Sequence, residues 1–338
     1  MRWDLYCHVI DNYGDIGFGW RLAADLAARG EQVRLLVDDA SALAWMAPRG
    51  AEGVTVGDWY AAGVPGDVVV DLFGCEPPLA ALAEMIERRP VWIHLDYLSA
   101  EPYVERSHGL PSPQANGLVK WFYFPGFTER TGGLLRERGL AAARSDFDRD
   151  RWLARHRIAP APGERLVSLF CYASAPVDSL LAWLGEAPTL LLLAPGPAQA
   201  LIPTRTPAPQ LRTLALPWFD QADYDRLLWS CDLNFVRGED SFVRAQWAGA
   251  PFVWHIYPQD DGAHAPKLEA FLERFGADAE IAALWRAWNG LGPTATRLPP
   301  LGPWRSRCET WRRRLIEQPD LTSQLIAFVA ARRPTDGG

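Results

Sequence analysis

The sequence predicts an α/β protein made of two Rossmann-like, doubly wound domains that face each other across a cleft. Short apolar runs typical of buried strands alternate with segments of helical spacing, first from residue 3 and again from residue 165. A proline-rich run, Ala-Pro-Ala-Pro-Gly at 159–163, separates the two series and is typical of a linker. Such domains bind ligands at the carboxyl ends of their strands, so we expect the site to lie in the cleft.

Composition and charge narrow the class of protein. The 338 residues are 49% hydrophobic and 22% charged, which is typical of a globular chain with a large core. A net charge of -7 argues against nucleic acid or an anionic membrane as the main partner. The five cysteines lack Cys-x-x-Cys spacing and no signal peptide is recognisable, so we expect reduced thiols and a cytoplasmic location. No apolar run reaches the length of a membrane span.

The first domain is expected to span residues 1–158. Its expected strands are 3–10, 32–37, 53–56, 67–73, 91–95 and 118–124, and its expected helices are 20–29, 41–47, 78–88 and 146–156. A glycine-rich turn over 11–19 would join the first strand to the first helix. The stretch 126–144 lacks a steady period and is expected to be a mobile loop.

The second domain is expected to span residues 159–310. Its expected strands are 166–171, 189–193, 211–216, 232–236 and 252–254, and its expected helices are 177–185, 220–229, 241–248, 265–275 and 278–288. A long amphipathic helix is expected over 304–331, with residues 311–333 packing back on the first domain. Residues after 333 are expected to be disordered.

The stretch from 230 to 251 carries the first candidate site. A short apolar strand leads through Arg237 and a glycine into Glu239, Asp240 and Ser241, residue types that open a helix. The N-terminus of a helix favours anions, and Arg237 adds a cation suited to phosphate. The alternative is an ordinary capped helix.

Two carboxylates near the N-terminus, Asp11 and Asp15, form the second candidate site. The glycines at 14, 17 and 19 do not have the spacing of a dinucleotide fingerprint, and the P-loop pattern is absent. Paired carboxylates suit the polarisation or deprotonation of a nucleophile. The alternative is that Asp15 caps the helix while Asp11 accepts hydrogen bonds within the turn.

Aromatic residues recur where strands of the second domain end. Phe170, Tyr172, Trp218 and Tyr224 could clamp a planar base, and Gln221 among them could read a base edge. Core packing of each ring and an exposed glutamine at a helix start are the alternatives.

Histidines and aspartates outside these clusters are further candidates for a site. Two neighbouring aspartates at 260 and 261 have no third ligand nearby in the sequence, so we expect a turn and no metal. His94 lies in an apolar run and is expected in the core, whereas Asp96 is a further candidate for a site on the first domain.

Three motifs resemble the bacterial protein-arginine rhamnosyltransferases that modify elongation factor P. They are Asp-Asn-Tyr-Gly-Asp-Ile-Gly at 11–17, Ser-Leu-Phe-Cys-Tyr at 168–172 and Phe-Val-Arg-Gly-Glu-Asp-Ser-Phe-Val-Arg-Ala-Gln-Trp-Ala at 235–248. The similarity extends over nearly the whole chain. It implies an inverting, metal-independent glycosyltransferase of GT-B fold, with dTDP-β-L-rhamnose as donor and one arginine of the factor's first domain as acceptor.

The resemblance also implies roles for individual residues. Asp11 and Asp15 match the paired aspartates of the family, with Asp15 as general base, and Glu239 matches its third essential carboxylate. The positions at the diphosphate are Arg237, Asp240 and Ser241, and those around the base are Phe170, Tyr172 and Gln221. The rest of the aromatic wall falls near Trp218 and Tyr224, where the family has phenylalanine.

The residues by themselves indicate a two-domain nucleotide-dependent transferase. The resemblance implies, more specifically, the transfer of L-rhamnose from dTDP-β-L-rhamnose to an arginine of elongation factor P, without metal or other cofactor. Two alternatives stay open. One is a sugar-nucleotide epimerase or small-molecule glycosyltransferase of the same fold, and the other is a non-catalytic nucleotide-sugar-binding module. A nicotinamide dehydrogenase fits least, because the phosphate fingerprint is wrong.

Overall fold

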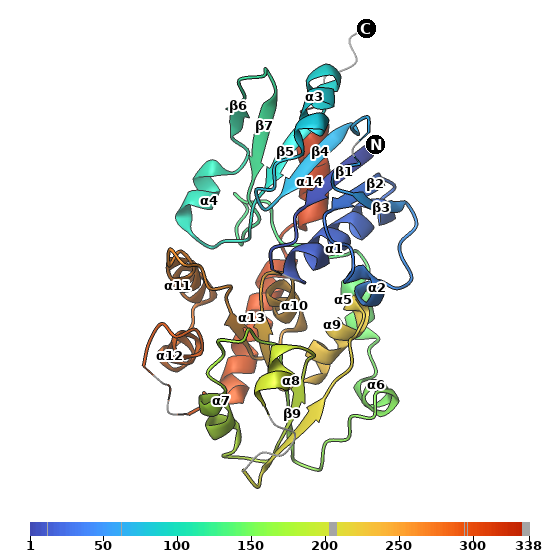
Figure 1. Ribbon diagram of the computed structural model, residues 1–338. Coiled ribbons are helices and arrows are strands. Elements are labelled where there is room, and N and C mark those ends of the chain that lie inside the picture. The colour runs from blue at the N-terminus through green and yellow to red at the C-terminus, as the bar shows by residue number, and fades with distance from the viewer. Residues whose placement is uncertain (12, 62, 203–207, 294, 296, 333–338) are drawn as a thin grey trace. The chain divides into compact units, whose positions relative to one another are not determined.

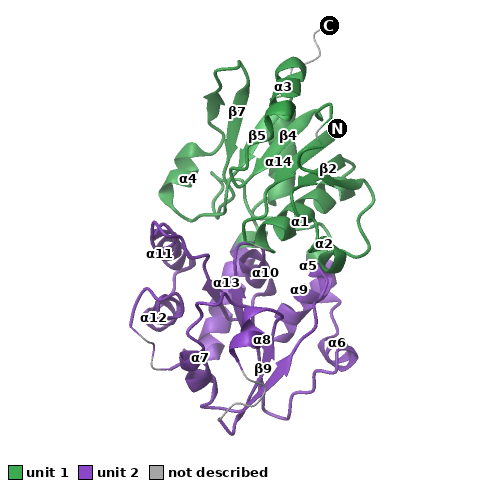
Figure 2. Cartoon of the chain, viewed as in Figure 1, with its two compact units in different colours: residues 1–140, 315–338 green, residues 141–314 purple. Residues whose placement is uncertain are grey.

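The chain divides into two compact units. The computed structural model describes residues 1–338 except 12, 62, 203–207, 294, 296 and 333–338 (Figure 1). Unit 1 comprises residues 1–140 and 315–338, and unit 2 comprises residues 141–314 (Figure 2). Each unit contains a mainly parallel sheet with helices packed on it, so the predicted α/β class is confirmed.

The described part of unit 1 forms a seven-stranded sheet of order β3-β2-β1-β4-β5-β7-β6. Its strands are β1 (Arg2–Cys7), β2 (Gln32–Val37), β3 (Val54–Asp58), β4 (Val68–Leu72), β5 (Val91–Leu95), β6 (Pro111–Pro113) and β7 (Val119–Tyr123). Only β6 runs antiparallel to its neighbour among these strands. The strand order reverses between β1 and β4, which is where doubly wound sheets bind ligands.

Helices cover the sheet of unit 1. They are α1 (Gly14–Ala28), α2 (Leu43–Met46), α3 (Leu79–Arg88), α4 (Pro102–Ser107) and α14 (Leu321–Ala330). The core combines side chains of α1, the central strands and α14, and every residue of β4 is buried. Burial on both faces explains why the strands read as nearly continuous apolar runs.

The described part of unit 2 forms a five-stranded parallel sheet of order β10-β9-β8-β11-β12. Its strands are β8 (Arg165–Leu169), β9 (Thr189–Leu193), β10 (Leu211–Ala215), β11 (Leu233–Arg237) and β12 (Phe252–His255). Its helices are α6 (Arg149–Arg155), α7 (Val177–Leu184), α8 (Pro197–Leu201), α9 (Gln221–Ser230), α10 (Asp240–Ala248), α11 (His264–Phe275) and α12 (Ala279–Trp288). Two further helices, α5 (Leu140–Ser145) and α13 (Leu301–Ile316), span the divisions between the units.

The division between the units differs from the predicted boundary at 158/159. It falls at 140/141, because α6 belongs to unit 2. Trp152 and Leu153 of α6 pack with Leu166 of its sheet, and the Trp152 indole donates to Asp223 at 2.9 Å. The proline-rich run at 159–163 is therefore a connection inside unit 2.

The C-terminal region also differs from the prediction. The single helix expected over 304–331 is two helices, α13 and α14, separated by a stretch that contains Pro319, which cannot continue a helix. Leu321, Leu325 and Val329 of α14 are buried in the core of unit 1, so the predicted return of the C-terminal segment to the first domain is confirmed. The residues expected to be disordered, and residue 333 at the end of that segment, lie outside the described residues.

Local elements were missed where tertiary contacts decide the structure. The predicted mobile loop at 126–144 contains buried residues, among them Leu134 and Leu135, and the Leu134 carbonyl accepts from the Leu321 amide at 2.9 Å. Packing against the C-terminal segment holds this stretch in place. The short elements β6, α4 and α8 were not predicted either, because they are too short to show a period.

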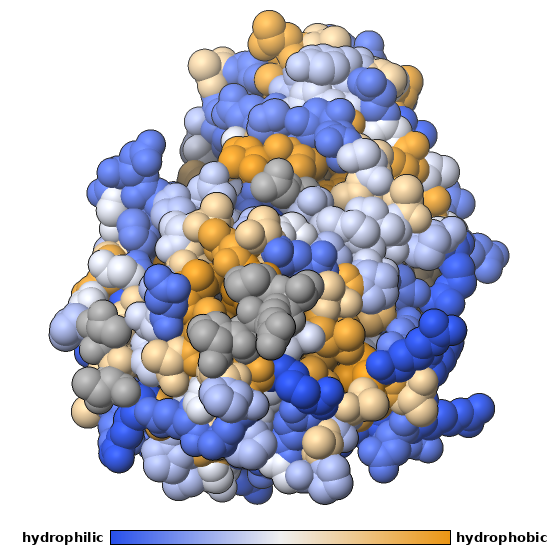
Figure 3. Space-filling model, turned by 60° about the horizontal axis from the view of Figure 1, so that its bottom comes forward, coloured by the Kyte–Doolittle hydropathy of each residue, from blue (hydrophilic) through white to orange (hydrophobic). Residues whose placement is uncertain are grey.

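No helix in the described residues is both long and apolar enough to cross a membrane. On the face shown in Figure 3, apolar side chains form small groups among polar ones.

Candidate functional site

Asp11 and Asp15 follow β1 at the point where the strand order of unit 1 reverses. The predicted glycine-rich turn over 11–19 is wrong in extent, because α1 begins at Gly14 and includes Asp15 in its first turn. The glycines serve close packing. A Cβ atom on Gly19 would lie 3.2 Å from the Leu72 side chain, and one on Gly14 would lie 2.8 Å from Oδ2 of Asp11.

Asp15 is held by the chain that precedes its helix. Its side chain is 2% exposed, and its Oδ2 accepts from the backbone amides of Ile10 and Asp11 at 2.9 Å each. Its Oδ1 accepts from the Tyr97 hydroxyl at 3.2 Å. Asp15 therefore does not cap the first turn of α1, in contrast to the alternative drawn from the sequence. The structure brings Asp11 and Asp15 together as expected.

Burial raises the pKa of Asp15, although hydrogen bonds from Asp11, Ile10 and Tyr97 and the charge of His8 act in the opposite direction. A carboxylate with a raised pKa is a stronger base. The chemistry available at this position is therefore proton acceptance.

His94 and Asp96 belong to a second cluster of polar side chains in unit 1. His94 Nδ1 lies 2.5 Å from Asp71 Oδ1, and its Nε2 lies 3.6 Å from Asp96 Oδ2. Burial acts to lower the pKa of His94, but the hydrogen bonds to both aspartates outweigh it and raise the pKa to about 9. His94 is only half-buried, so the predicted core histidine is wrong: the side chain is paired with carboxylates at the end of its strand. Sequence periodicity could not reveal the pairing, because Asp71 lies on a neighbouring strand.

In unit 2, Arg237 ends β11 and Gly238, with a φ of 63°, makes the turn into α10. Ser241 binds back to this turn: its hydroxyl donates to the Arg237 carbonyl and accepts from the Arg237 amide at 3.1 Å. Glu239 is the N-cap residue and is buried, but within the described chain its side chain makes no capping hydrogen bond. The capped helix offered as the alternative is therefore not what the structure has.

The Arg237 guanidinium contacts the aromatic residues that are candidates for binding the nucleotide base. Its Cζ lies 4.6 Å from the centre of the Phe170 ring and 4.5 Å from that of Tyr172, and its Nη1 donates to the Cys171 carbonyl at 3.3 Å. Phe170 and Tyr172 follow β8, which neighbours β11 in the sheet. Arg237 is buried, and cation–π contacts of this kind stabilise a guanidinium that has lost its water.

The remaining predicted residues lie at the same carboxyl edge of the sheet. Tyr224 of α9 packs edge-on against Phe170, with ring centres 6.0 Å apart. Gln221 is the first residue of α9, and Trp218 lies in the connection before it. Trp218 is 41% exposed, which argues against core packing for this ring. Asp240 opens α10.

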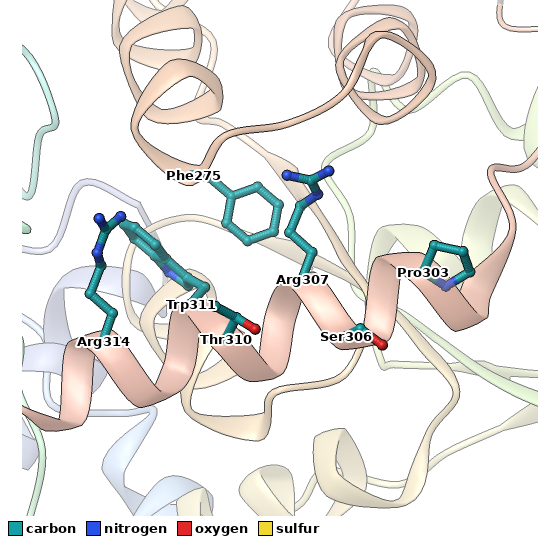
Figure 4. Close-up of a pocket in the computed structure, with 7 residues that line it drawn as sticks. All are labelled: Phe275, Pro303, Ser306, Arg307, Thr310, Trp311 and Arg314. Atoms are coloured by element: carbon teal, nitrogen blue, oxygen red, sulfur yellow. The ribbon is translucent and has the colours of Figure 1, made fainter.

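A pocket of about 390 Å³ lies elsewhere on unit 2, beside α13 (Figure 4). Its described lining is Phe275, Pro303, Ser306, Arg307, Thr310, Trp311 and Arg314, which includes none of the predicted site residues. Arg307 donates to the Gly276 carbonyl and lies 3.5 Å from Asp278, so it is engaged in the fold. Among the described residues, no three His, Cys, Asp or Glu side chains are grouped to hold a metal ion.

Comparison with known proteins decides the family. Residues 3–330 match the family described as "Elongation-Factor P (EF-P) rhamnosyltransferase EarP". The chain belongs to this family. The protein-arginine rhamnosyltransferase of Pseudomonas putida is 45% identical to it, over 96% of this chain and 98% of that protein.

Solved structures agree with the EarP assignment. The structure reported as "Structural basis for EarP-mediated arginine glycosylation of translation elongation factor EF-P" has a TM-score of 0.67 and 32% identity, covering 98% of this chain and 99% of that chain. The spinosyn rhamnosyltransferase SpnG, at 14% identity and a TM-score of 0.55, covers 97% of this chain and 99% of its own and shows the shared fold. This EarP chain is therefore a glycosyltransferase of GT-B fold, and the predicted family, fold and enzyme class are confirmed.

Proposed function

We propose that this EarP protein transfers L-rhamnose from dTDP-β-L-rhamnose to an arginine of elongation factor P, with inversion and without a metal ion, in the cytoplasm. The observation that carries the proposal is the buried Asp15, whose two oxygens are held by hydrogen bonds and whose pKa is raised. A base of this kind suits the deprotonation of a nitrogen nucleophile.

Unit 2 binds the donor in this proposal. Arg237 and the N-terminal turn of α10, with Asp240 and Ser241, hold the diphosphate, because a fixed cation and the positive end of a helix dipole both favour anions. They stabilise the charge that develops on the leaving diphosphate, which is the role that a divalent metal would otherwise have. The thymine base of the donor lies against the aromatic side chains of Phe170, Tyr172, Trp218 and Tyr224. Gln221 lies at the edge of the thymine ring.

Unit 1 acts on the acceptor. The arginine guanidinium stays protonated because its pKa lies above about 12, so a carboxylate cannot deprotonate it in advance. Asp11 and Asp15 orient the guanidinium, and Glu239 of unit 2 acts close to the sugar. The bond from the anomeric carbon to the diphosphate breaks as the bond to the guanidine nitrogen forms, and Oδ1 of Asp15 takes the proton. Attack opposite the leaving group gives inversion.

Two variants test these roles. Asp15→Asn is expected to lower transfer by on the order of 100-fold or more and to leave dTDP affinity nearly unchanged, because it removes the proton acceptor alone. Arg237→Ala is expected to weaken dTDP binding by roughly 10- to 100-fold, because charge-assisted contacts to the diphosphate are lost. Intact-mass analysis of elongation factor P after reaction with dTDP-rhamnose measures transfer, and calorimetry measures affinity for dTDP.

The expected product is elongation factor P heavier by one deoxyhexose on an arginine. Loss of dTDP binding in Asp15→Asn together with normal binding in Arg237→Ala would show that the roles are reversed. Incubation with the sugar nucleotide alone is the control, and steady turnover without the protein acceptor would favour an epimerase instead.

A further inference from the structure

We propose that Tyr97 is a positioning residue for Asp15, and that Phe73 holds the Tyr97 ring in place for this role. The inference deepens the proposed function and rests on it, since Asp15 is the base there. Tyr97 lies two positions after the end of β5 and Phe73 directly follows β4, so both come from strand ends beside the switch point of the unit 1 sheet.

The first observation is the hydrogen bond from Tyr97 to Asp15. The backbone amides of residues 10 and 11 both donate to Oδ2 of Asp15, so by themselves they restrain only one oxygen of the carboxylate. The Tyr97 hydroxyl binds the other oxygen, Oδ1, at 3.2 Å. Bonds at both oxygens define the plane of the carboxylate. They also define the direction in which the remaining lone pair of Oδ1 points toward a proton donor.

The second observation is the backbone of Phe73. Its φ of 60° lies in the left-handed region, which a bulky aromatic residue rarely adopts and which is found mainly where the surrounding structure enforces it. The Phe73 amide donates to the Leu95 carbonyl at 2.7 Å, which ties this unusual turn to the end of β5.

The unusual backbone of Phe73 places its ring on Tyr97. The two rings are stacked, with centres 4.2 Å apart and planes 12° from parallel. Phe73 also contacts Phe18 of α1, with ring centres 5.2 Å apart, and α1 is the helix that carries Asp15. Phe73 therefore connects Tyr97 to the same helix as its hydrogen-bond partner, and the three side chains form one packed unit.

Tyr97 also affects the protonation of Asp15. The other titratable groups near the Asp15 carboxyl are His8, Asp11 and Cys7, all from β1 or the residues after it. Burial raises the pKa of Asp15, and the hydrogen bond from Tyr97 lowers it. Removal of the hydroxyl should therefore move the pKa of Asp15 upward, an effect that a purely structural role of the ring would not have.

Tyr97→Phe tests the inference, because it removes the hydroxyl and keeps the stacked ring. We expect kcat to fall roughly 10-fold through loss of orientation. We expect the acid limb of the kcat–pH profile to move to higher pH and KM for dTDP-rhamnose to stay unchanged. Tyr60→Phe is the matched control, since Tyr60 is 78% exposed and loses the same atom. Phe73→Leu should also lower kcat, because Tyr97 then loses its stacking partner.

Thermal melting of each variant checks that the fold is intact. A Tyr97→Phe enzyme with wild-type kcat and an unmoved acid limb would overturn the inference. If Asp15→Asn is inactive in the same assay, such a Tyr97→Phe result overturns the positioning role of Tyr97 and leaves Asp15 as the base. If Asp15→Asn transfers rhamnose normally, the proposed base is wrong, and the positioning role fails with it.

Discussion

Asp15 is an ionisable side chain buried at a cost to the fold. Burial raises its pKa above the ordinary value of 3.8, so the folded state binds the proton more tightly than the unfolded state does. The stabilisation from this proton is fully present below the unfolded pKa and is lost as the pH rises through the folded pKa. At neutral pH the charged carboxylate therefore lowers stability, which is typical of groups retained for chemistry.

The first prediction at this scale concerns the stability of Asp15→Asn. An asparagine can accept the two backbone hydrogen bonds at Oδ1 and donate to the Tyr97 oxygen without a buried charge. We expect its melting temperature at pH 7 to equal or exceed that of the wild type by a few degrees, and the difference to vanish near pH 4. Scanning fluorimetry at both pH values measures this. A variant markedly less stable at pH 7 would show that the ionised hydrogen bonds outweigh burial.

At the scale of elements, β4 and β5 are joined by a buried polar pair inside an apolar sheet. Asp71 is opposite His94 in the strand register, and it also accepts from the Trp92 indole at 2.8 Å. Each oxygen of the buried carboxylate thus has a partner, which is the condition for burying a charge in a sheet. The pair fixes the position of the C-terminal end of β5, and Tyr97 lies two residues after this end.

The pKa of about 9 for His94 predicts how stability changes with pH. Protonated His94 stabilises the folded state, and this stabilisation is fully present below the pKa of the unfolded state, near 6.5. It is lost as the pH rises through about 9. We expect the melting temperature of the wild type to fall over this range and that of His94→Gln to be several degrees lower at pH 6 with a flatter profile. His264→Gln on α11 is the control. Parallel profiles for wild type and His94→Gln would contradict the assignment.

At the scale of the whole molecule, unit 1 is assembled from two distant parts of the chain. The chain leaves unit 1 after Leu140 and returns at Leu315, and α14 then completes the core of the first sheet. Arg29 of unit 1 pairs with Asp320, the N-cap residue of α14, at 2.7 Å. Unit 1 therefore depends on a segment that follows unit 2 in the chain.

Leu325→Ala tests this dependence. Leu325 is fully buried, so truncation removes apolar contacts and leaves a cavity, with an expected loss of about 2–4 kcal/mol in the free energy of unfolding. Ile316→Ala, at a side chain that is 37% exposed, is the control and should cost far less. Urea unfolding of both variants measures the difference. Equal losses would show that α14 is not part of the unit 1 core.

Much of the site was predictable because its residues lie in local patterns. Asp11 and Asp15 are four residues apart at a strand end, and Arg237, Glu239 and Ser241 lie within one strand-to-helix turn. Tyr97 and Phe73 were not predictable, because the stacking between them depends on how two neighbouring strands end. The structure shows where the candidate residues lie, and the roles assigned to all of them, Trp218 and Gln221 included, stay predictions.

Amino-acid order alone specifies the alternation of strands and helices, the family and the two candidate clusters, because apolar periodicity, turn residues and motifs are local properties of the chain. Packing in three dimensions sets where α1 begins, places α6 in unit 2 and α14 in the core of unit 1, and selects the residues that hold Asp15. Each of these depends on contacts between segments far apart in the chain, such as Gly19 against Leu72 or Tyr97 against Asp15, and the free energy of those contacts appears only after the segments have packed.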